Sequence, residues 1–570
     1  MSTNSVNSSR IHLHHVRFNY EIAVIVAIAL SLVIRLLIPS YFAYGSVHDD
    51  ELMLRMARRL IFPTGNAWDQ FAIQKEPGYS YLLAVLLKFE ISPVVVVHLL
   101  YLAATYWLFR ALRKVTLDSI AAICVICICL NPGFFGIGGS RIYNVSFQTA
   151  LIVGLCAATI DLMVTWDKHQ RFSLRTVWSG LVLMFVLVAV SITRPDYLFF
   201  TIPILGCVSM WNLISRWRNS YDLLFSIVIL TAVVASPFLG KTIIRQVNSN
   251  NFGVYLVNDV NEGNFKRMME TLASIEEDET SKFIVVSSAT LRKVEKQSET
   301  FALLSPFLRS REVDLWQSIT CDSGGPCNEI AGGYLPLMLR DGIVSTFEIS
   351  SAREFQRVTG QIADEVEFAC DEGRLQCGAG GIGAWLPPAK KINFGLTLAE
   401  FAKLTVGRTY SFSDRTVFSG IGEPFSASAE AVPMWNILRE KSWGLRSVTI
   451  GGTPNPLRSL ISHMLAIISI ILRVLAVIGT SSFLLLGLGR KADSGIVRIG
   501  VSMLFSTLLL TSFYALMYAN SFGTSVDGGN LAYLMMAQPV ALVVASFGFQ
   551  LFADYIRAHQ SPNTIKSVPS

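Results

Sequence analysis

Long apolar runs constrain this chain more than any other feature. Runs of about 18 or more residues recur towards both ends of the 570-residue sequence, and each is long enough to cross a ~30 Å hydrocarbon core as a helix. Only 15% of the residues are charged and 52% are hydrophobic, whereas soluble domains carry about 25% charged residues. The sequence therefore predicts an α-helical polytopic membrane protein.

We expect about ten transmembrane helices, judged by the length of the apolar runs. The first runs from Ile22 to Pro39, and Arg35 near its end is expected to snorkel to the interface. The stretch 79–89 is too short to span comfortably and is predicted to be a helix lying in the interface. The other expected spans are 93–112, 118–135, 143–165, 176–193, 196–213, 221–239, 457–488, 496–519 and 531–555.

The basic residues predict the orientation. With the N-terminus in the cytoplasm, every basic cluster between closely spaced helices falls on the cytoplasmic side, as the positive-inside rule requires. These clusters are topology determinants, so nucleic-acid binding is not expected. The predicted parts are a cytoplasmic N-terminus (1–21), an N-terminal transmembrane module (22–240) with an outer loop (45–75), an extracytoplasmic soluble domain (241–455), C-terminal transmembrane helices (456–556) and a cytoplasmic tail (557–570).

The extracytoplasmic region 241–455 is expected to be an α-rich domain. Helical spacing of apolar residues is clearest in Ala352–Cys370 and Ala289–Leu304. This region also holds four cysteines, and cysteines in an oxidising compartment suggest two disulfides with three possible connectivities. The local pairs Cys321–Cys327 and Cys370–Cys377 are favoured. A zinc site is the competing interpretation, but the tight spacing typical of structural zinc is absent.

An acidic cluster follows the first span directly. Asp49, Asp50 and Glu51 are preceded by His48 and begin an amphipathic segment that is predicted to be a helix over Asp50–Ile61. A helix start explains the cluster in part, with Asp49 as N-cap and the helix dipole favouring acidic residues in the first turn. A rigid carboxylate pair at a membrane surface also suits catalysis. The helix-start and the catalytic interpretation are compatible with each other. Asp49 and Asp50 are the catalytic candidates.

Basic and aromatic residues on the same predicted side complete the candidate site. Arg141 and Arg194 each follow the outer end of a span, and an arginine fork binds phosphate bidentately. Lys75 with Tyr79, and Tyr143, are further candidates for binding substrate phosphate. Anchoring to lipid headgroups is the alternative for Arg141, for Arg194 and for Lys75 with Tyr79.

These motifs resemble the GT-C superfamily of polytopic glycosyltransferases, which includes the protein O-mannosyltransferases and the lipid A aminoarabinose transferases. The resemblance rests on His48-Asp49-Asp50-Glu51, Lys75-Glu76-Pro77-Gly78-Tyr79, Arg141-Ile142-Tyr143 and Thr193-Arg194-Pro195-Asp196. More narrowly, HDDELMLRMA followed by QKEPGYSYLLA is similar to bacterial membrane proteins with HDD and KGPGYP motifs. The chain departs from the family at Glu76, where proline or glycine is usual, and in the loop before the last span, which lacks an arginine.

The resemblance implies transfer of a sugar from a polyprenyl-phosphate donor to a glycan, lipid or protein acceptor on the extracytoplasmic face of the plasma (inner) membrane. Asp49 and Asp50 then act either as the base for the acceptor or as ligands of a divalent cation, Mg or Mn. A transporter or flippase of a lipid-linked saccharide is the alternative. The sequence favours the enzyme, because the charges cluster at the outer ends of spans and no internal repeat is evident. The identity of the sugar, the acceptor and the oligomeric state does not follow from the sequence.

Overall fold

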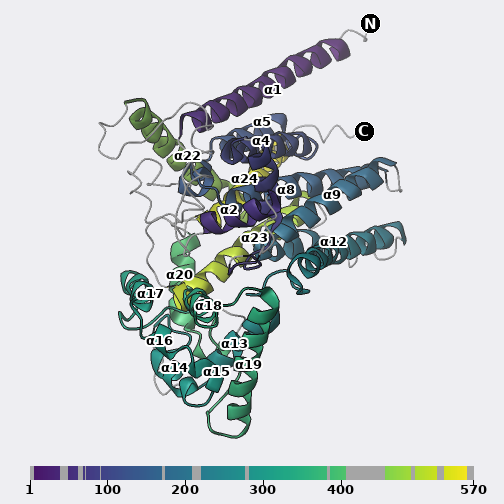
Figure 1. The fold of residues 1–570 in the computed structure, drawn as a ribbon. Helices are drawn as coiled ribbons and strands as arrows, with labels where there is room; N and C mark the ends of the chain where they lie inside the picture. Colours follow the sequence, from purple (N-terminus) through teal and green to yellow (C-terminus); the bar gives the residue numbers. More distant parts are fainter. Residues whose placement is uncertain are drawn as a thin grey trace.

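The computed structural model describes residues 5–38, 49–61, 68–70, 72–89, 91–169, 174–207, 209, 220–276, 282–381, 385–405, 456–489, 495–522 and 532–560. Helices dominate these residues, which form two parts in Figure 1. A stack of long helices holds both ends of the chain, and a cluster of shorter helices lies below it. We call these the membrane domain and the polar domain.

Within the described residues, nine helices are long and apolar enough to cross a membrane, as Tyr20–Leu37, Pro93–Leu112, Asp118–Phe135, Asn144–Trp166, Leu174–Thr193, Ser226–Phe252, Ser459–Gly487, Ile496–Phe522 and Leu534–His559. The chain is therefore an α-helical polytopic membrane protein. The helices that provide these spans are α1 (Ser5–Leu37), α4 (Pro93–Leu112), α5 (Asp118–Cys129) with α6 (Pro132–Phe135), α8 (Asn144–His169), α9 (Leu174–Thr193), α12 (Ser220–Phe252), α22 (Pro456–Gly489), α23 (Gly495–Met517) with η5 (Tyr518–Phe522), and η6 (Ala532–Met536) with α24 (Ala537–Gln560).

One predicted span, 196–213, has no counterpart among these nine helices and is described only in part. Its described residues form η1 (Pro195–Tyr197), α10 (Leu198–Thr201) and the π-helix η2 (Ile202–Cys207), while 208 and 210–219 lie outside the described residues. Pro203 lies in η2, and proline removes a backbone donor and clashes with the preceding turn, which accounts for the change of helix type. The next span, α12, continues to Phe252, past the predicted boundary at 240.

Three short helices sit beside the spans. α2 (Asp49–Ile61) begins one residue before the predicted start, and α3 (Gly78–Lys88) matches the predicted interfacial helix within one residue at each end. α7 (Ile137–Ser140) belongs to the turn between α6 and α8. The strongly amphipathic α2 packs on α3, where Ser80 Oγ donates to the carbonyl of Met53 at 3.2 Å.

The polar domain contains α13 (Gly263–Ser274), α14 (Ser288–Glu295), α15 (Glu299–Ala302), α16 (Ser305–Leu308), α17 (Arg311–Asp322), α18 (Leu335–Thr346), α19 (Ala352–Asp371), η3 (Ala389–Lys391) and α20 (Phe394–Leu404). α19 matches the helix predicted over Ala352–Cys370. The helix predicted over Ala289–Leu304 is instead divided into α14 and α15. The division has a local cause, because Ser298 Oγ accepts from the amide of Phe301 at 3.0 Å and starts a new helix.

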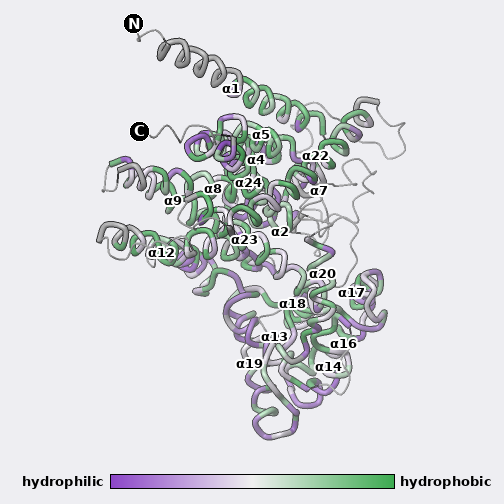
Figure 2. Tube along the Cα trace, turned by 180° about the vertical axis from the view of Figure 1, so that it is seen from behind, coloured by the Kyte–Doolittle hydropathy of each residue, from purple (hydrophilic) through white to green (hydrophobic). Residues whose placement is uncertain are grey.

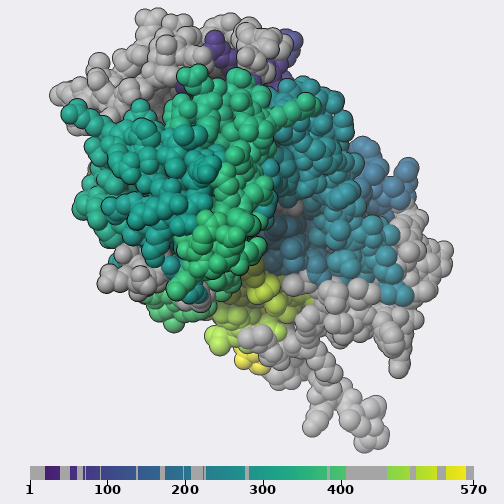
Figure 3. All heavy atoms as spheres, turned by 60° about the horizontal axis from the view of Figure 1, so that its bottom comes forward, coloured from purple at the N-terminus to yellow at the C-terminus, as the bar shows by residue number. Residues whose placement is uncertain are grey.

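The two parts differ in the hydropathy of their residues. In Figure 2 the long helices are mostly hydrophobic, while hydrophilic segments concentrate in the polar domain and near its junction with the spans. Figure 3 looks onto the polar domain, whose teal and green atoms form one continuous body beside the blue atoms of the N-terminal helices. The polar domain has its own core around Phe265, Phe301 and Phe355.

Candidate active site

Asp50 lies in the first turn of α2 and is 0% exposed. Its carboxylate faces Arg141, which follows α7 and is itself buried. Arg141 Nε lies 3.0 Å from each carboxylate oxygen, and Arg141 Nη2 lies 2.5 Å from Oδ1. Hydrogen bonds between charged groups in this fork geometry fix both partners in orientation. The structure thus joins two of the predicted site residues.

The turn that carries Arg141 is held from α1. Arg35 Nη1 donates to the carbonyl of Gly139 at 3.3 Å and to Ser140 Oγ at 3.1 Å. Ser140 Oγ in turn donates to the carbonyl of Phe135. Arg35 is only 2% exposed, so the expectation that it snorkels to the interface is wrong. These carbonyl and hydroxyl acceptors compensate for the loss of water around its guanidinium.

Tyr79 and Tyr143 lie at the same centre. Tyr79 is 0% exposed and stacks on Phe147 with ring centroids 5.7 Å apart. Its hydroxyl has no hydrogen-bond partner among the described residues, an unusual state for a buried polar atom. Burial raises the pKa of Tyr79, and the negative charge of Asp50 adds to the shift. The guanidinium of Arg141 lies over the Tyr143 ring, 4.9 Å from its centroid.

Arg194 forms a second centre with the neighbouring Asp196 and with residues from two other segments. It donates from Nε to Asp196 Oδ2 at 3.0 Å, from Nη1 to Asn144 Oδ1 at 2.7 Å and from Nη2 to the Tyr514 hydroxyl at 3.3 Å. The Tyr514 hydroxyl donates to Asp196 Oδ2 at 2.5 Å. Because Arg141 and Asn144 are three positions apart, one short segment contacts both centres.

The Lys75–Tyr79 motif packs against the end of α9. A Cβ placed on Gly78 would lie 2.6 Å from the carbonyl oxygen of Ile192, so only glycine permits this approach without a shift. Glu76 is 4% exposed, and its Oε1 accepts from Asn258 Nδ2 at 2.7 Å. Burial raises the pKa of Glu76, nearby Asp196 adds to the rise, and nearby Lys75 and Lys241 oppose it.

The polar domain fixes the loop that precedes this motif. Arg340 of α18 donates from Nη1 and Nη2 to the two carboxylate oxygens of Asp259, each at 2.6 Å, and both residues are buried. Arg340 Nε also donates to the carbonyl of Gln70, and the amide of Asp259 donates to the carbonyl of Ile73 at 3.0 Å. The polar domain therefore forms part of the frame of the site.

The sequence predicted several members of these centres and missed others. Asp50, Tyr79, Arg141 and Tyr143 come together, and Arg194 lies in the adjacent centre. Lys75 is half-buried beside Glu76. His48 and the side chains of Asp49 and Glu51 lie outside the described residues. Glu76 and Asp196 belong to the quoted motifs, but no local signal marks the remaining members, which are Asn144, Asn258 and Tyr514.

The described residues do not provide a cation site at Asp50. Both of its carboxylate oxygens face a guanidinium, which already supplies the positive charge that a metal would bring. No group of three or more His, Cys, Asp or Glu side chains with metal-binding geometry occurs in the described part of the chain. The predicted Mg or Mn ion also involves Asp49, whose side chain lies outside the described residues, so it stays a prediction and no step below uses one.

The four cysteines of the polar domain form two local disulfides. Cys321, in the last turn of α17, is bonded to Cys327, with Cα atoms 4.3 Å apart. Cys370, in the last turn of α19, is bonded to Cys377, with Cα atoms 5.6 Å apart. These are the two pairs that the sequence favoured over zinc. Each bond closes the turn at the end of a helix, so both are structural and lie apart from Asp50 in the sequence and the fold.

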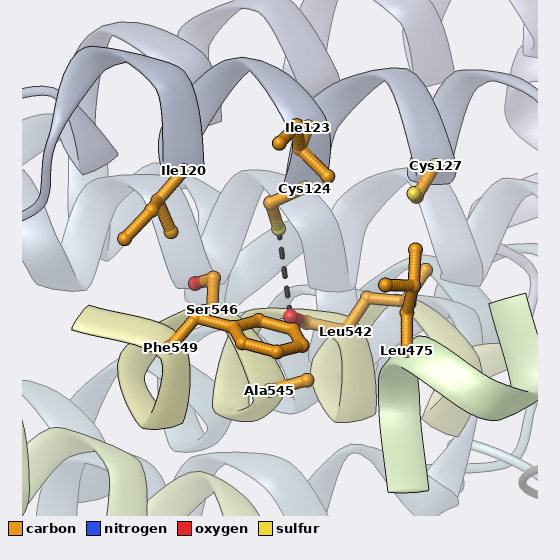
Figure 4. A pocket seen from close by; sticks show the side chains of 9 residues that line it. All are labelled: Ile120, Ile123, Cys124, Cys127, Leu475, Leu542, Ala545, Ser546 and Phe549. Atoms are coloured by element: carbon orange, nitrogen blue, oxygen red, sulfur yellow. Dashed lines mark hydrogen bonds between the residues drawn. The ribbon is translucent and has the colours of Figure 1, made fainter. Parts of the chain in front are cut away.

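An apolar cavity of about 230 Å³ lies between α5, α22 and α24 (Figure 4). Side chains such as Ile123, Leu475 and Phe549 line it, and Cys124 Sγ faces the carbonyl of Leu542 at 3.5 Å. It contains no member of the Asp50 or Arg194 centres.

No family model and no curated protein matches the chain. Among solved structures, the apo state of ArnT from Cupriavidus metallidurans is similar with a TM-score of 0.30 and 12% identity, covering 93% of this chain and 77% of that chain. A TM-score this low carries no conclusion, so the functional argument rests on the residues of the two centres.

Proposed function

We propose that the chain is a membrane glycosyltransferase that moves a sugar from a polyprenyl-phosphate donor to a glycan, lipid or protein acceptor on the extracytoplasmic face. One observation carries the proposal: a fully buried carboxylate, Asp50, is paired with an arginine beside a buried tyrosine hydroxyl that has no partner among the described residues. A carboxylate base, a cation for phosphate and a free hydroxyl are the groups that this transfer requires.

The pair suggests an exchange of partners during the reaction. Arg141 neutralises Asp50 in the substrate-free site, and its guanidinium fork fits a phosphate as well as it fits a carboxylate. When the donor phosphate binds Arg141, Asp50 loses its counter-charge and becomes a stronger base. Asp50 then takes the proton of the acceptor hydroxyl while the acceptor oxygen attacks the anomeric carbon. The bond from that carbon to the phosphate oxygen breaks, and polyprenyl phosphate leaves with the electron pair. A single displacement of this kind inverts the anomeric carbon.

The second centre has a supporting role in this scheme. Arg194 is already bonded to Asp196, Asn144 and Tyr514, and Asn144 directly follows Tyr143. Arg194 therefore orients the segment that carries Arg141. Asp49 begins α2 beside Asp50 and is the second candidate for the base.

The decisive assay separates transfer from transport. The purified chain is placed in lipid vesicles with undecaprenyl phosphate that carries tritiated mannose or aminoarabinose, together with a lipid and glycan extract as acceptor. A transferase moves the label from the polyprenyl lipid to the extract and leaves undecaprenyl phosphate. A flippase leaves the label on the lipid and only changes its leaflet. Movement of intact lipid-linked sugar without transfer from either donor would contradict the proposal.

A further inference from the structure

Helix α20 has an apolar face that no other described element covers. Its exposed side chains are Phe394, Gly395, Leu398, Ala399, Ala402 and Lys403. Phe394 is 71% exposed and Leu398 is 69% exposed, and they lie on one side because residues four positions apart share a helix face. Only Lys403 in this set is charged. A helix whose free side faces water normally presents polar residues there.

The opposite side of α20 is bound to the membrane domain. Asn520 in η5, at the end of the span that begins with α23, donates from Nδ2 to Thr397 Oγ1 at 3.0 Å. The same side chain accepts from the amide of Asn393 through Oδ1 at 2.8 Å. Asn393 also caps α20, since its Oδ1 accepts from the amide of Leu396. One asparagine of the span thus holds the first turn of α20 in place.

The last turn of α20 enters the membrane domain itself. Leu404 is 5% exposed and belongs to the hydrophobic core that the spans share, and Phe401 packs against that core. In Figure 1, α20 lies beside the end of α23, next to the polar domain. The exposed apolar face therefore belongs to a helix whose other side is packed on the core of the spans, at the level where the span beginning with α23 ends.

We infer that the exposed face of α20 is inserted into the bilayer leaflet on the side of the polar domain. The occupant of this face is lipid: the apolar side chains Phe394 and Leu398 contact acyl chains. Lys403 lies at the edge of the face and is half exposed, beside Glu400 at 3.4 Å, where an ammonium reaches the headgroup phosphates. Residues 394–404 thus form an interfacial anchor within the segment predicted to be a soluble domain, and the anchor sets the height of the polar domain above the membrane.

The inference is tested by fluorescence quenching on the full-length chain in phosphatidylcholine vesicles. Phe394→Cys and Leu398→Cys are each labelled with an environment-sensitive maleimide dye. Quenching is measured with nitroxide lipids that carry the spin label near the headgroup or near the acyl-chain end, and separately with aqueous iodide. Leu315→Cys, 58% exposed on α17, is the solvent control, and Ile470→Cys, 61% exposed on α22, is the lipid control. The wild-type chain reports the background from its native cysteines.

At positions 394 and 398 we expect strong quenching of the dye by the shallow nitroxide and little quenching by iodide. The quenching by the shallow nitroxide should be about as strong as the quenching of the dye at 470 by the deep nitroxide, or stronger. The dye at 315 should show the reverse. Quenching at 394 and 398 by iodide alone would overturn the inference, because the face would then lie in water. Quenching by neither agent would also overturn it, because protein would then cover the face. Neither result depends on glycosyl transfer, so a failure here is distinct from a failure of the proposed function.

Discussion

Asp50 and Arg141 are 91 positions apart in the sequence and form a buried ion pair, with Arg141 Nη2 2.5 Å from Asp50 Oδ1. The pair joins the start of α2 to the turn before α8. It gives the carboxylate one orientation and keeps a guanidinium next to it. The contact therefore combines a structural role with a chemical one, and the two roles are separable by mutation.

Arg141→Gln tests the structural role. Removing one partner of a buried pair leaves the other charge uncompensated, at a cost of about 3–5 kcal/mol. The free energy of unfolding is expected to fall by an amount in this range, measured as a lower unfolding temperature in detergent. The double variant Asp50→Asn/Arg141→Gln removes both charges and should regain part of that loss. A double variant that loses as much as the sum of the two singles would show that the residues do not interact.

Gly78→Ala tests the close packing of the Lys75–Tyr79 motif on α9. The new methyl group would lie 2.6 Å from the carbonyl oxygen of Ile192, so α3 must shift away from α9. We expect lower transfer activity and a lower unfolding temperature. Gly180→Ala in α9 is the matched control, because no atom of another described residue lies within 4 Å of its added Cβ, and it should leave both quantities nearly unchanged. Equal effects of the two substitutions would argue against the packing constraint.

Arg340→Met tests how the polar domain holds the loop before the motif. The substitution leaves Asp259 buried without its bidentate partner and releases the carbonyl of Gln70, so we expect a loss of about 3–5 kcal/mol and faster proteolysis of residues 68–76. Arg374→Met removes an exposed pair with Glu372 and is expected to change stability by about 0.5 kcal/mol or less. A small effect of Arg340→Met on both measurements would show that Arg340 does not hold the loop before the motif in place.

Asp341 predicts a dependence of stability on pH. It accepts from Gln70 Nε2 at 3.0 Å, and burial raises its pKa to about 7, with Arg340 opposing the rise and Glu312 adding to it. A carboxyl whose pKa is higher in the folded state binds more protons there, so the stability from Asp341 is present below pH 4 and is lost as the pH rises through about 7. Asp341→Asn should therefore gain stability over the wild type between pH 5 and pH 8. The comparison is made as unfolding temperature against pH, and a difference that stays constant across this range would contradict the shift.

The sequence predicted the local elements of the fold better than their contacts. Apolar periodicity placed α2 and α3 within a residue, and cysteine spacing favoured the two disulfides that the structure has. The division between α14 and α15 was missed because the capping role of Ser298 is not distinguishable from that of any other serine in a helical pattern. Arg35 was misjudged for a related reason: a lone arginine near the end of a span gives no sign of the carbonyl and hydroxyl acceptors that surround it.

The candidate site was predictable only as a set of segments. Spacing and charge bias placed Asp50, Arg141 and Arg194 on one side of the membrane, but nothing in the sequence predicts that Arg141 pairs with Asp50 while Arg194 pairs with Asp196. Asn258 and Tyr514 lie far from the motifs along the chain, and tertiary packing alone brings them to Glu76 and Arg194. The apolar pattern of α20 resembles that of a buried helix, and only the structure distinguishes a face in the core from a face that is uncovered.

The most direct measurement of the central claim is the rate of sugar transfer in three variants: Asp50→Asn, Asp49→Asn and the double variant Asp50→Asn/Arg141→Gln. Loss of a general base typically slows a reaction by about 10²–10⁴-fold. We predict a loss of this size in both variants that lack Asp50, including the double variant, which has no uncompensated charge and whose fold is verified by its unfolding temperature. Transfer at the wild-type rate by the folded double variant would contradict the account, and a comparable loss in Asp49→Asn alone would assign the base to Asp49 instead.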